Sequence, residues 1–92
     1  MIGSFRHKGL KEFFETGNKR GIRPELVSRL GRRLDVLEAA LELNDIDAHG
    51  FNLHRLKGNR QGEWAISVSG NWRITFRFVN SEALDVNLED YH

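Results

Sequence analysis

The chain has 92 residues, with 14 Lys or Arg and 13 Asp or Glu, so its formal net charge is only +1. This length allows one domain with a single modest core, expected to span residues 1–92, and excludes a second domain. Because there is no cysteine, disulfide bonds and thiolate metal sites are excluded, and the lack of a secretory signal or long apolar run predicts a cytoplasmic protein with no membrane partner.

The N-terminal part of the chain predicts a short strand followed by a brief helix. Residues 1–7 alternate loosely between apolar and polar side chains, as in a strand. Residues 8–16 place Leu10, Phe13 and Phe14 on one helical face, and Gly17 provides the stop. The helix therefore has one apolar face with which to cover a core.

A longer helix is predicted to start at Pro24, a residue that fits the first helical position. Its apolar face consists of leucines spaced three or four residues apart: Leu26, Leu30, Leu34, Leu37 and Leu41. Its outward side, together with the segment before it, carries a basic ridge formed by Arg20, Arg23, Arg29, Arg32 and Arg33. Such a ridge is either a solvated helix face, which is the commoner case, or a binding surface.

From residue 52 onward the hydrophobic period changes from 3.6 to 2. Strands are predicted over residues 52–56, 63–68, 72–78 and 84–89, with tight turns at 69–71 and 80–81. The predicted fold is therefore α+β in the order β-α-α-β-β-β-β, with two N-terminal helices packed on one face of a mainly antiparallel sheet. The opposite face of that sheet is predicted to be polar and basic.

The charge is unevenly distributed along the chain. Residues 1–79 carry all 14 basic side chains and nine of the 13 acidic ones, a net charge of +5, whereas residues 80–92 carry four acids and no Lys or Arg. A small basic body favours a polyanionic partner such as nucleic acid, and an acidic antagonist protein fits equally well.

Side chains suited to acid–base chemistry on RNA converge on the polar face. Attack of a ribose 2′-hydroxyl on the adjacent phosphate needs a base, cations that hold the phosphate oxygens and an acid for the leaving 5′-oxygen. The base can be a His or Asp, the cations Lys and Arg, and the acid a protonated His or a Tyr. Such a reaction needs no metal or other cofactor. The candidates are His54, Lys57, Arg60, Arg73 and Arg77, together with Asp90, Tyr91 and His92 at the end of the last strand.

Three separated segments resemble a known protein family. Residues 53–64, 71–76 and 89–92 (LHRLKGNRQGEW, NWRITF and EDYH) are similar, in that order, to HigB toxins of the RelE/ParE superfamily, and the first five residues and the chain length also fit. The resemblance implies a RelE-like microbial RNase fold and a type II toxin that acts as an mRNA interferase. Such a toxin is a ribosome-dependent endoribonuclease that cuts mRNA in the 30S A site and so inhibits translation.

The same resemblance implies the partners and the roles of individual residues. The partners would be the ribosome, its mRNA and a HigA-like helix-turn-helix antitoxin, with operator DNA contacted indirectly through the antitoxin. His54, Asp90, Tyr91 and His92 would be catalytic, and Lys57 and Arg73 would contact phosphate. The resemblance leaves open which residue is the general base and which the general acid.

Three other functions are compatible with the sequence. ParE-type relatives share the fold but poison DNA gyrase without nuclease activity, and a ribosome- or RNA-binding module could use the same basic face. His54, Asp90 and His92 also have the composition of a two-histidine, one-carboxylate metal site, although Lys57 and Arg73 would repel a cation placed there.

Overall fold

A four-stranded antiparallel sheet in the order β1-β2-β3-β4 forms the C-terminal half of the chain. The computed structural model describes residues 1–91, so His92, one of the predicted catalytic residues, lies outside the described part. The strands are β1 (His54–Arg55), β2 (Glu63–Ser69), β3 (Trp72–Val79) and β4 (Glu82–Asp90). The helical elements are α1 (Lys8–Thr16), η1 (Pro24–Leu26), α2 (Val27–Ala39), α3 (Leu43–Asp47) and η2 (Gly58–Arg60), the two η elements being 3₁₀ helices.

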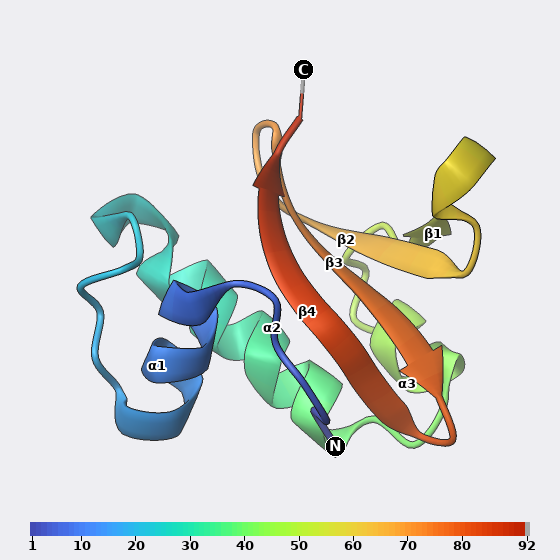
Figure 1. Ribbon diagram of the computed structural model, residues 1–92, viewed down its shortest axis with the longest axis horizontal. Helices are drawn as coiled ribbons and strands as arrows, with labels where there is room; N and C mark the ends of the chain where they lie inside the picture. Colours follow the sequence, from blue (N-terminus) through green and yellow to red (C-terminus); the bar gives the residue numbers. More distant parts are fainter. Residues whose placement is uncertain (92) are drawn as a thin grey trace.

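Helices α1 and α2 lie on one side of the sheet (Figure 1), which confirms the predicted α+β arrangement. The core forms where the apolar face of α2 meets the covered face of the sheet. Its fully buried side chains include Leu30, Leu34 and Leu37 from α2, and Ile66, Ile74 and Phe76 from β2 and β3. Burial of this leucine face explains why the helix forms where the 3.6-residue period predicted it.

The predicted end of the second helix was wrong. The helix ends at Ala39, and the Leu41 side chain, expected in the core, is 72% exposed. The Asp45 carboxylate accepts hydrogen bonds from the backbone N–H groups of Leu41 (2.9 Å) and Glu42 (3.1 Å). The bond from Glu42 belongs to a capping box that starts α3, a helix that was not predicted from the sequence.

The N-terminal segment also differs from the prediction, because it forms no regular strand. Its pairing with β4 consists of two isolated parallel bridges, Ile2 with Ala83 and Phe5 with Val86. Between these bridges β4 bulges at Asp85, whose φ is 54° and whose N–H donates to Ser4 Oγ (2.8 Å). The bulge interrupts the edge that a continuous fifth strand would need.

The sheet face that the helices leave uncovered is less exposed to solvent than its pattern of polar residues predicts. Ala65 and Thr75, which are directly opposite each other on β2 and β3, are both fully buried. The Thr75 hydroxyl donates to Glu89 Oε2 (3.2 Å), so an ion-pair network on this face lies against it. Within residues 1–91, no helix is long and apolar enough to cross a membrane.

Candidate active site

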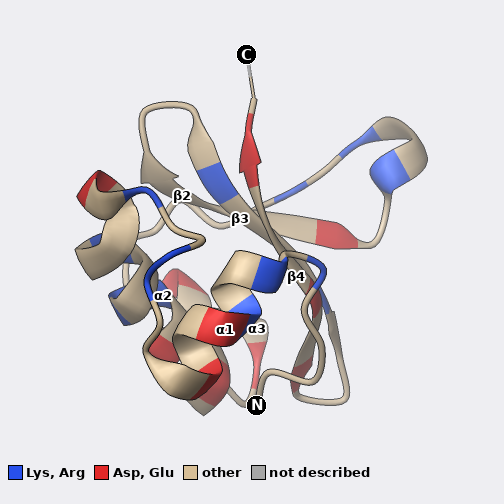
Figure 2. Cartoon of the chain, turned by 60° about the vertical axis from the view of Figure 1, so that its left-hand side comes forward, with Lys and Arg blue, Asp and Glu red and all other residues tan. Residues whose placement is uncertain are grey.

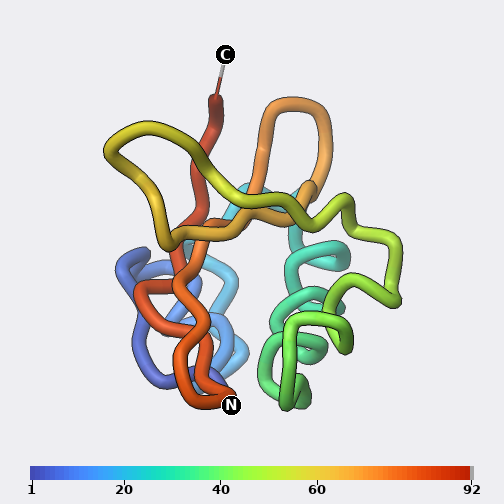
Figure 3. Tube along the Cα trace, turned by 90° about the vertical axis from the view of Figure 1, so that its right-hand side faces the viewer, coloured from blue at the N-terminus to red at the C-terminus, as the bar shows by residue number. Residues whose placement is uncertain are grey.

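Three segments that carry predicted site residues project from one end of the molecule. They are the loop around η2, with Lys57 and Arg60, the start of β3 after the β2–β3 turn, with Arg73, and the C-terminal end of β4. The N-terminus lies at the opposite end (Figure 3). Antiparallel pairing places the β2–β3 turn beside the end of β4, because Trp72 is in register with Asp90. The β1–β2 connection leaves the opposite end of β2 and reaches β4 through the ion pair of Arg60 with Glu89 (2.6 Å).

The strand register places His54 and Arg73 on the same face of the sheet. His54 is opposite Ala65, Ala65 is opposite Thr75, and Arg73 is the next residue of β3 on that face. Side chains that are directly opposite in an antiparallel pair share a face, as do alternate residues along a strand. The imidazole and the guanidinium therefore face the same surface, in neighbouring rows.

A backbone carbonyl determines the tautomer of the His54 ring. His54 Nδ1 lies 2.8 Å from the carbonyl oxygen of Asn52. Because a carbonyl oxygen only accepts, Nδ1 must carry the hydrogen of this bond, and in the neutral ring Nε2 is then the unprotonated nitrogen. Nε2 is the ring atom that could accept a proton from a substrate.

Tyr91 is held at the end of β4 by two contacts. Its backbone N–H donates to the carbonyl of Asn71 in the β2–β3 turn (3.0 Å). Its ring lies under the Arg73 guanidinium, whose central carbon is 4.3 Å from the ring centroid. The residue is 45% exposed, so Tyr91 is accessible from solvent while the chain end is anchored.

Asp90 lies on the other side of the strand from Tyr91. It is in register with Trp72, whereas Glu89 is in register with Arg73. Alternation along β4 therefore directs Asp90 towards the helix-covered face at its rim, where the Arg23 guanidinium lies 5.7 Å from the Trp72 ring centroid. The two adjacent residues that were predicted as catalytic thus approach the end of the strand from opposite faces.

Glu89 is the centre of an ion-pair network that the sequence analysis did not identify. Its carboxylate accepts two hydrogen bonds from Arg60 (2.6 and 2.9 Å) and two from Arg73 (3.1 and 3.3 Å). Arg60 also pairs with Glu63 (2.9 Å). Figure 2 shows the acidic end of β4 beside a basic part of β3 and the basic loop. No signal in the sequence revealed Glu89, because the register shift between Thr75 and Arg77, which brings Glu89 opposite Arg73, has no local signature.

This network shifts the pKa values of its members. Hydrogen bonds from Arg60, and then those from Arg73, lower the pKa of Glu89 to about 2, against the opposing effect of burial. The hydrogen bonds that Arg60 donates to Glu89 and Glu63 raise the pKa of Arg60. Both partners are therefore fully ionised near neutral pH, and the Glu89 carboxylate is too weak a base to take a proton there.

The low pKa of Glu89 predicts a loss of stability in acid. The carboxyl titrates at about 2 in the folded chain against an ordinary value of 4.5, so its contribution is complete above pH 4.5 and is lost as the pH falls towards 2. We expect a fall of up to about 3 kcal/mol in the free energy of unfolding, and a smaller fall in Glu89→Gln. Urea unfolding at pH 5, 4 and 3 measures it. Asp85→Asn, which breaks an ion pair whose two side chains are 40% and 49% exposed, serves as the control, and equal acid profiles for the two variants would contradict the assignment.

The other predicted cations have different surroundings. Arg77 pairs with Asp85 across 3.4 Å at the surface. Lys57 is exposed and forms no ion pair with the rest of residues 1–91. It lines an open hollow of about 550 Å³ together with Arg55, Leu56, Gly58 and Gln61. Lys57 is thus available to a ligand, whereas the guanidinium groups of Arg60 and Arg73 already bind a carboxylate.

Part of the basic ridge is attached to the sheet. Arg33 Nε donates to the carbonyl of Ser67 (2.7 Å), and the guanidinium lies 4.2 Å from the Phe51 ring centroid. Arg29 Nη1 lies 3.3 Å from Ser69 Oγ. These residues therefore connect α2 to β2, and they have a structural role whether or not the ridge binds a partner.

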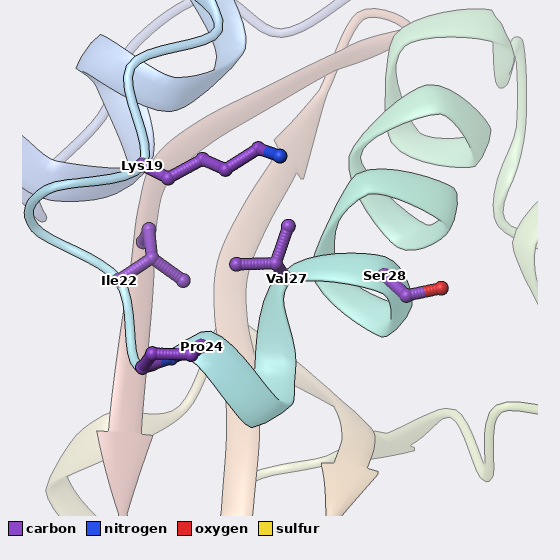
Figure 4. Close-up of a pocket in the computed structure, with 5 residues that line it drawn as sticks. All are labelled: Lys19, Ile22, Pro24, Val27 and Ser28. Atoms are coloured by element: carbon purple, nitrogen blue, oxygen red, sulfur yellow. The ribbon is translucent and has the colours of Figure 1, made fainter.

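A second hollow, of about 470 Å³, lies on the helical side of the molecule. It is formed where the segment after α1 approaches the start of α2 (Figure 4) and is lined by Lys19, Ile22, Pro24, Val27 and Ser28. None of the predicted site residues lines it. The predicted chemistry therefore belongs to the end of the sheet and not to this hollow.

The structure provides no candidate metal centre among the residues it describes. Within residues 1–91, no group of three His, Asp or Glu side chains is arranged to hold a metal ion. The metal site considered from the sequence includes His92, which lies outside this range. The metal dependence of cleavage tests that alternative.

Comparison with known proteins identifies similar sequences. Residues 3–92 match the model of a family described as the RelE-like toxin of type II toxin–antitoxin system HigB. The chain is 47% identical to the Endoribonuclease HigB of Proteus vulgaris over 92 residues, which cover 100% of both chains. It is 29% identical to the Toxin HigB-1 of Vibrio cholerae serotype O1 over 93 residues, which cover 99% of this chain and 98% of that toxin.

Proposed function

The chain belongs to the HigB family of RelE-like toxins from type II toxin–antitoxin systems, and on this basis we propose that it is an endoribonuclease. Its substrate would be mRNA in the A site of the 30S subunit, and cleavage there would stop translation. The observation that carries the proposal is the 47% identity to an Endoribonuclease HigB along the whole chain. The clustering of acid–base side chains and cations at one end of the sheet supports it.

The geometry supports a specific assignment of roles. In the neutral ring of His54, Nδ1 carries the hydrogen that it donates to the Asn52 carbonyl, and Nε2 is unprotonated. Nε2 is therefore suited to take the proton of the attacking 2′-hydroxyl. Asp90 is the other candidate base. Lys57 and Arg73 would stabilise the negative charge of the phosphorane. Tyr91 or His92 would protonate the leaving 5′-oxygen. Direct contact of Arg60 or Arg77 with RNA stays a prediction; both are paired with carboxylates, as Arg73 is.

The family also determines the kind of partner that we propose. A type II toxin is neutralised by a protein antitoxin, and the partner we propose is a HigA-like helix-turn-helix protein that would link the toxin to operator DNA. Because the substrate is held by ribosomes, the site of action would be the cytoplasm. Binding of an acidic surface of the antitoxin to the basic body of the toxin would fit the +5 charge of residues 1–79.

The chemistry of the cut ends tests this mechanism. Attack by the 2′-hydroxyl leaves a 2′,3′-cyclic phosphate and a 5′-hydroxyl, so the downstream fragment is expected to accept label from polynucleotide kinase without prior phosphatase treatment. Cleavage is also expected to continue with EDTA presaturated with Mg²⁺, which leaves ribosomes intact and removes Zn²⁺ or Mn²⁺. Fragments with 5′-phosphates, or activity lost with this chelator and restored by one divalent ion, would favour the metal mechanism.

A further inference from the structure

Glu89 lies at the point where two separate segments of the proposed site meet. It precedes Asp90 and Tyr91 on β4, and its Oε1 accepts hydrogen bonds from both Arg60 (2.9 Å) and Arg73 (3.1 Å). Its Oε2 accepts from Arg60 (2.6 Å) and from the Thr75 hydroxyl (3.2 Å). The carboxylate is therefore fixed by several donors. Its side chain is only 21% exposed, so it is also largely screened from water.

We propose that Glu89 is a positioning residue: it fixes the Arg73 guanidinium and the Lys57 loop in the arrangement that an RNA phosphate requires. This inference rests on the proposed nuclease function and extends it to a residue that would not touch the substrate. Two lines of geometry carry it, one for each segment.

The first line concerns the loop. Lys57 is the N-cap residue of η2, and Arg60 is the last residue of that short helix. Arg60 binds Glu89 with both Nη atoms and also binds Glu63 at the start of β2. Within residues 1–91, Arg60 is the only η2 residue whose side chain hydrogen-bonds to β4. The bidentate pair therefore holds the segment that carries Lys57 against the sheet.

The second line concerns Arg73. Its Nε and Nη2 atoms both point to Glu89 Oε1, and the same guanidinium lies 4.3 Å from the centroid of the Tyr91 ring. A planar guanidinium held at one edge by a carboxylate and on one face by an aromatic ring has little freedom to rotate. Glu89 therefore orients both the proposed phosphate contact and, through it, the ring of a proposed acid.

The charges explain why a neutral side chain could not replace Glu89. Arg60 and Arg73 share this one carboxylate, with Glu63 as the second anion of the network. Without the negative charge between them, the guanidinium groups of Arg60 and Arg73 would repel each other, and each would move towards solvent. Glu89→Gln keeps the size of the side chain but removes the negative charge and one acceptor atom.

The test compares Glu89→Gln with Asp85→Asn. Asp85→Asn breaks the surface pair with Arg77, and asparagine tolerates the left-handed backbone at this position. For Glu89→Gln we expect kcat on ribosome-bound mRNA to fall by about 10- to 100-fold, the range found for residues that orient the ligands of a catalytic metal. The KM should change little. The rate should fall by the same factor at every pH, so that the shape of the pH profile is kept, because Glu89 takes no proton in the reaction. Asp85→Asn is expected to stay within a factor of about two of the wild type.

A measurement on the free protein separates this inference from the proposed function. Hydrogen exchange of residues 57–62 is expected to be faster in Glu89→Gln than in the wild type and unchanged in Asp85→Asn. Arg60→Lys, which cannot form the bidentate pair, should also accelerate exchange, and it provides a second variant should Glu89→Gln fold poorly. Unchanged exchange in both variants, or cleavage by Glu89→Gln at the wild-type rate or faster, would overturn the inference. Failure of the nuclease proposal would appear in the wild type itself, which would not cleave mRNA.

Discussion

Removal of His92 is expected to slow cleavage of ribosome-bound mRNA by on the order of 10²-fold or more, the usual effect of losing a general acid or base. Toxicity in cells should disappear with it. Folding should survive, because the described chain is already anchored before this point by the hydrogen bond from Tyr91 N–H to the carbonyl of Asn71 (3.0 Å). Primer extension on a defined mRNA measures the cleavage rate, and thermal unfolding measures the stability.

The substitution His92→Gln separates proton transfer from positioning. Glutamine keeps a hydrogen-bonding group but cannot carry a proton near neutral pH. An inactive Gln variant would support a role in proton transfer, whereas an active one would reduce His92 to a contact residue. A truncated chain that still arrests growth and cuts mRNA at the wild-type rate would show that the C-terminal residue takes no part in catalysis.

Replacing either proposed phosphate contact is expected to cause the next largest loss. Lys57→Ala and Arg73→Ala should each lower kcat by on the order of 10²-fold, the scale seen when one group that stabilises transition-state charge is removed. Lys57 is exposed, so its removal should leave the melting temperature unchanged. Cleavage assays on ribosome-bound mRNA, with thermal unfolding in parallel, provide both readouts.

Arg73 needs a different control, because it also has a structural role. Its side chain is only 14% exposed and pairs with Glu89 across 3.1 Å, so Arg73→Ala should also lower the melting temperature by a few degrees. Arg73→Lys keeps the charge and loses the stacking geometry on Tyr91, and it should be partly active. Lys11→Ala removes the same charge as Lys57→Ala from an exposed position on α1. If Lys11→Ala lowers cleavage as much as Lys57→Ala does, the effect of Lys57 is one of net charge alone.

The parts of the fold that the sequence predicted are those with a local physical cause. The leucine spacing of α2 and the alternation of β2, β3 and β4 report directly on which side chains face the core. The end of α2 could not be predicted in this way, because no glycine marks it. The end of α2 depends on Asp45. Its carboxylate accepts hydrogen bonds from the N–H groups of Leu41 and Glu42 and so starts α3.

The proposed site shows the same division between local and long-range causes. Residue types and their order pointed to a wider set, because these types fit the chemistry of RNA cleavage: His54, Lys57, Arg60, Arg73, Arg77 and residues 90–92. The resemblance to HigB toxins singled out Lys57 and Arg73 as phosphate contacts. The role of Glu89 depends on cross-strand register and on a loop that folds back to it, neither of which has a local signature. In the sequence, Glu89 is simply one more polar residue in an alternating strand.

The most direct test of the central proposal is primer extension on one defined mRNA in a translating ribosome system, with the wild-type chain and the chain lacking His92 added in parallel. The proposal predicts new 5′ ends within the coding sequence with the wild-type chain, and full-length mRNA with the truncated chain or without ribosomes. The proposal would be contradicted if the mRNA stayed full-length with a wild-type chain that still arrests growth in cells. Inhibition of DNA gyrase by the same preparation would then assign the toxin to the ParE type of action.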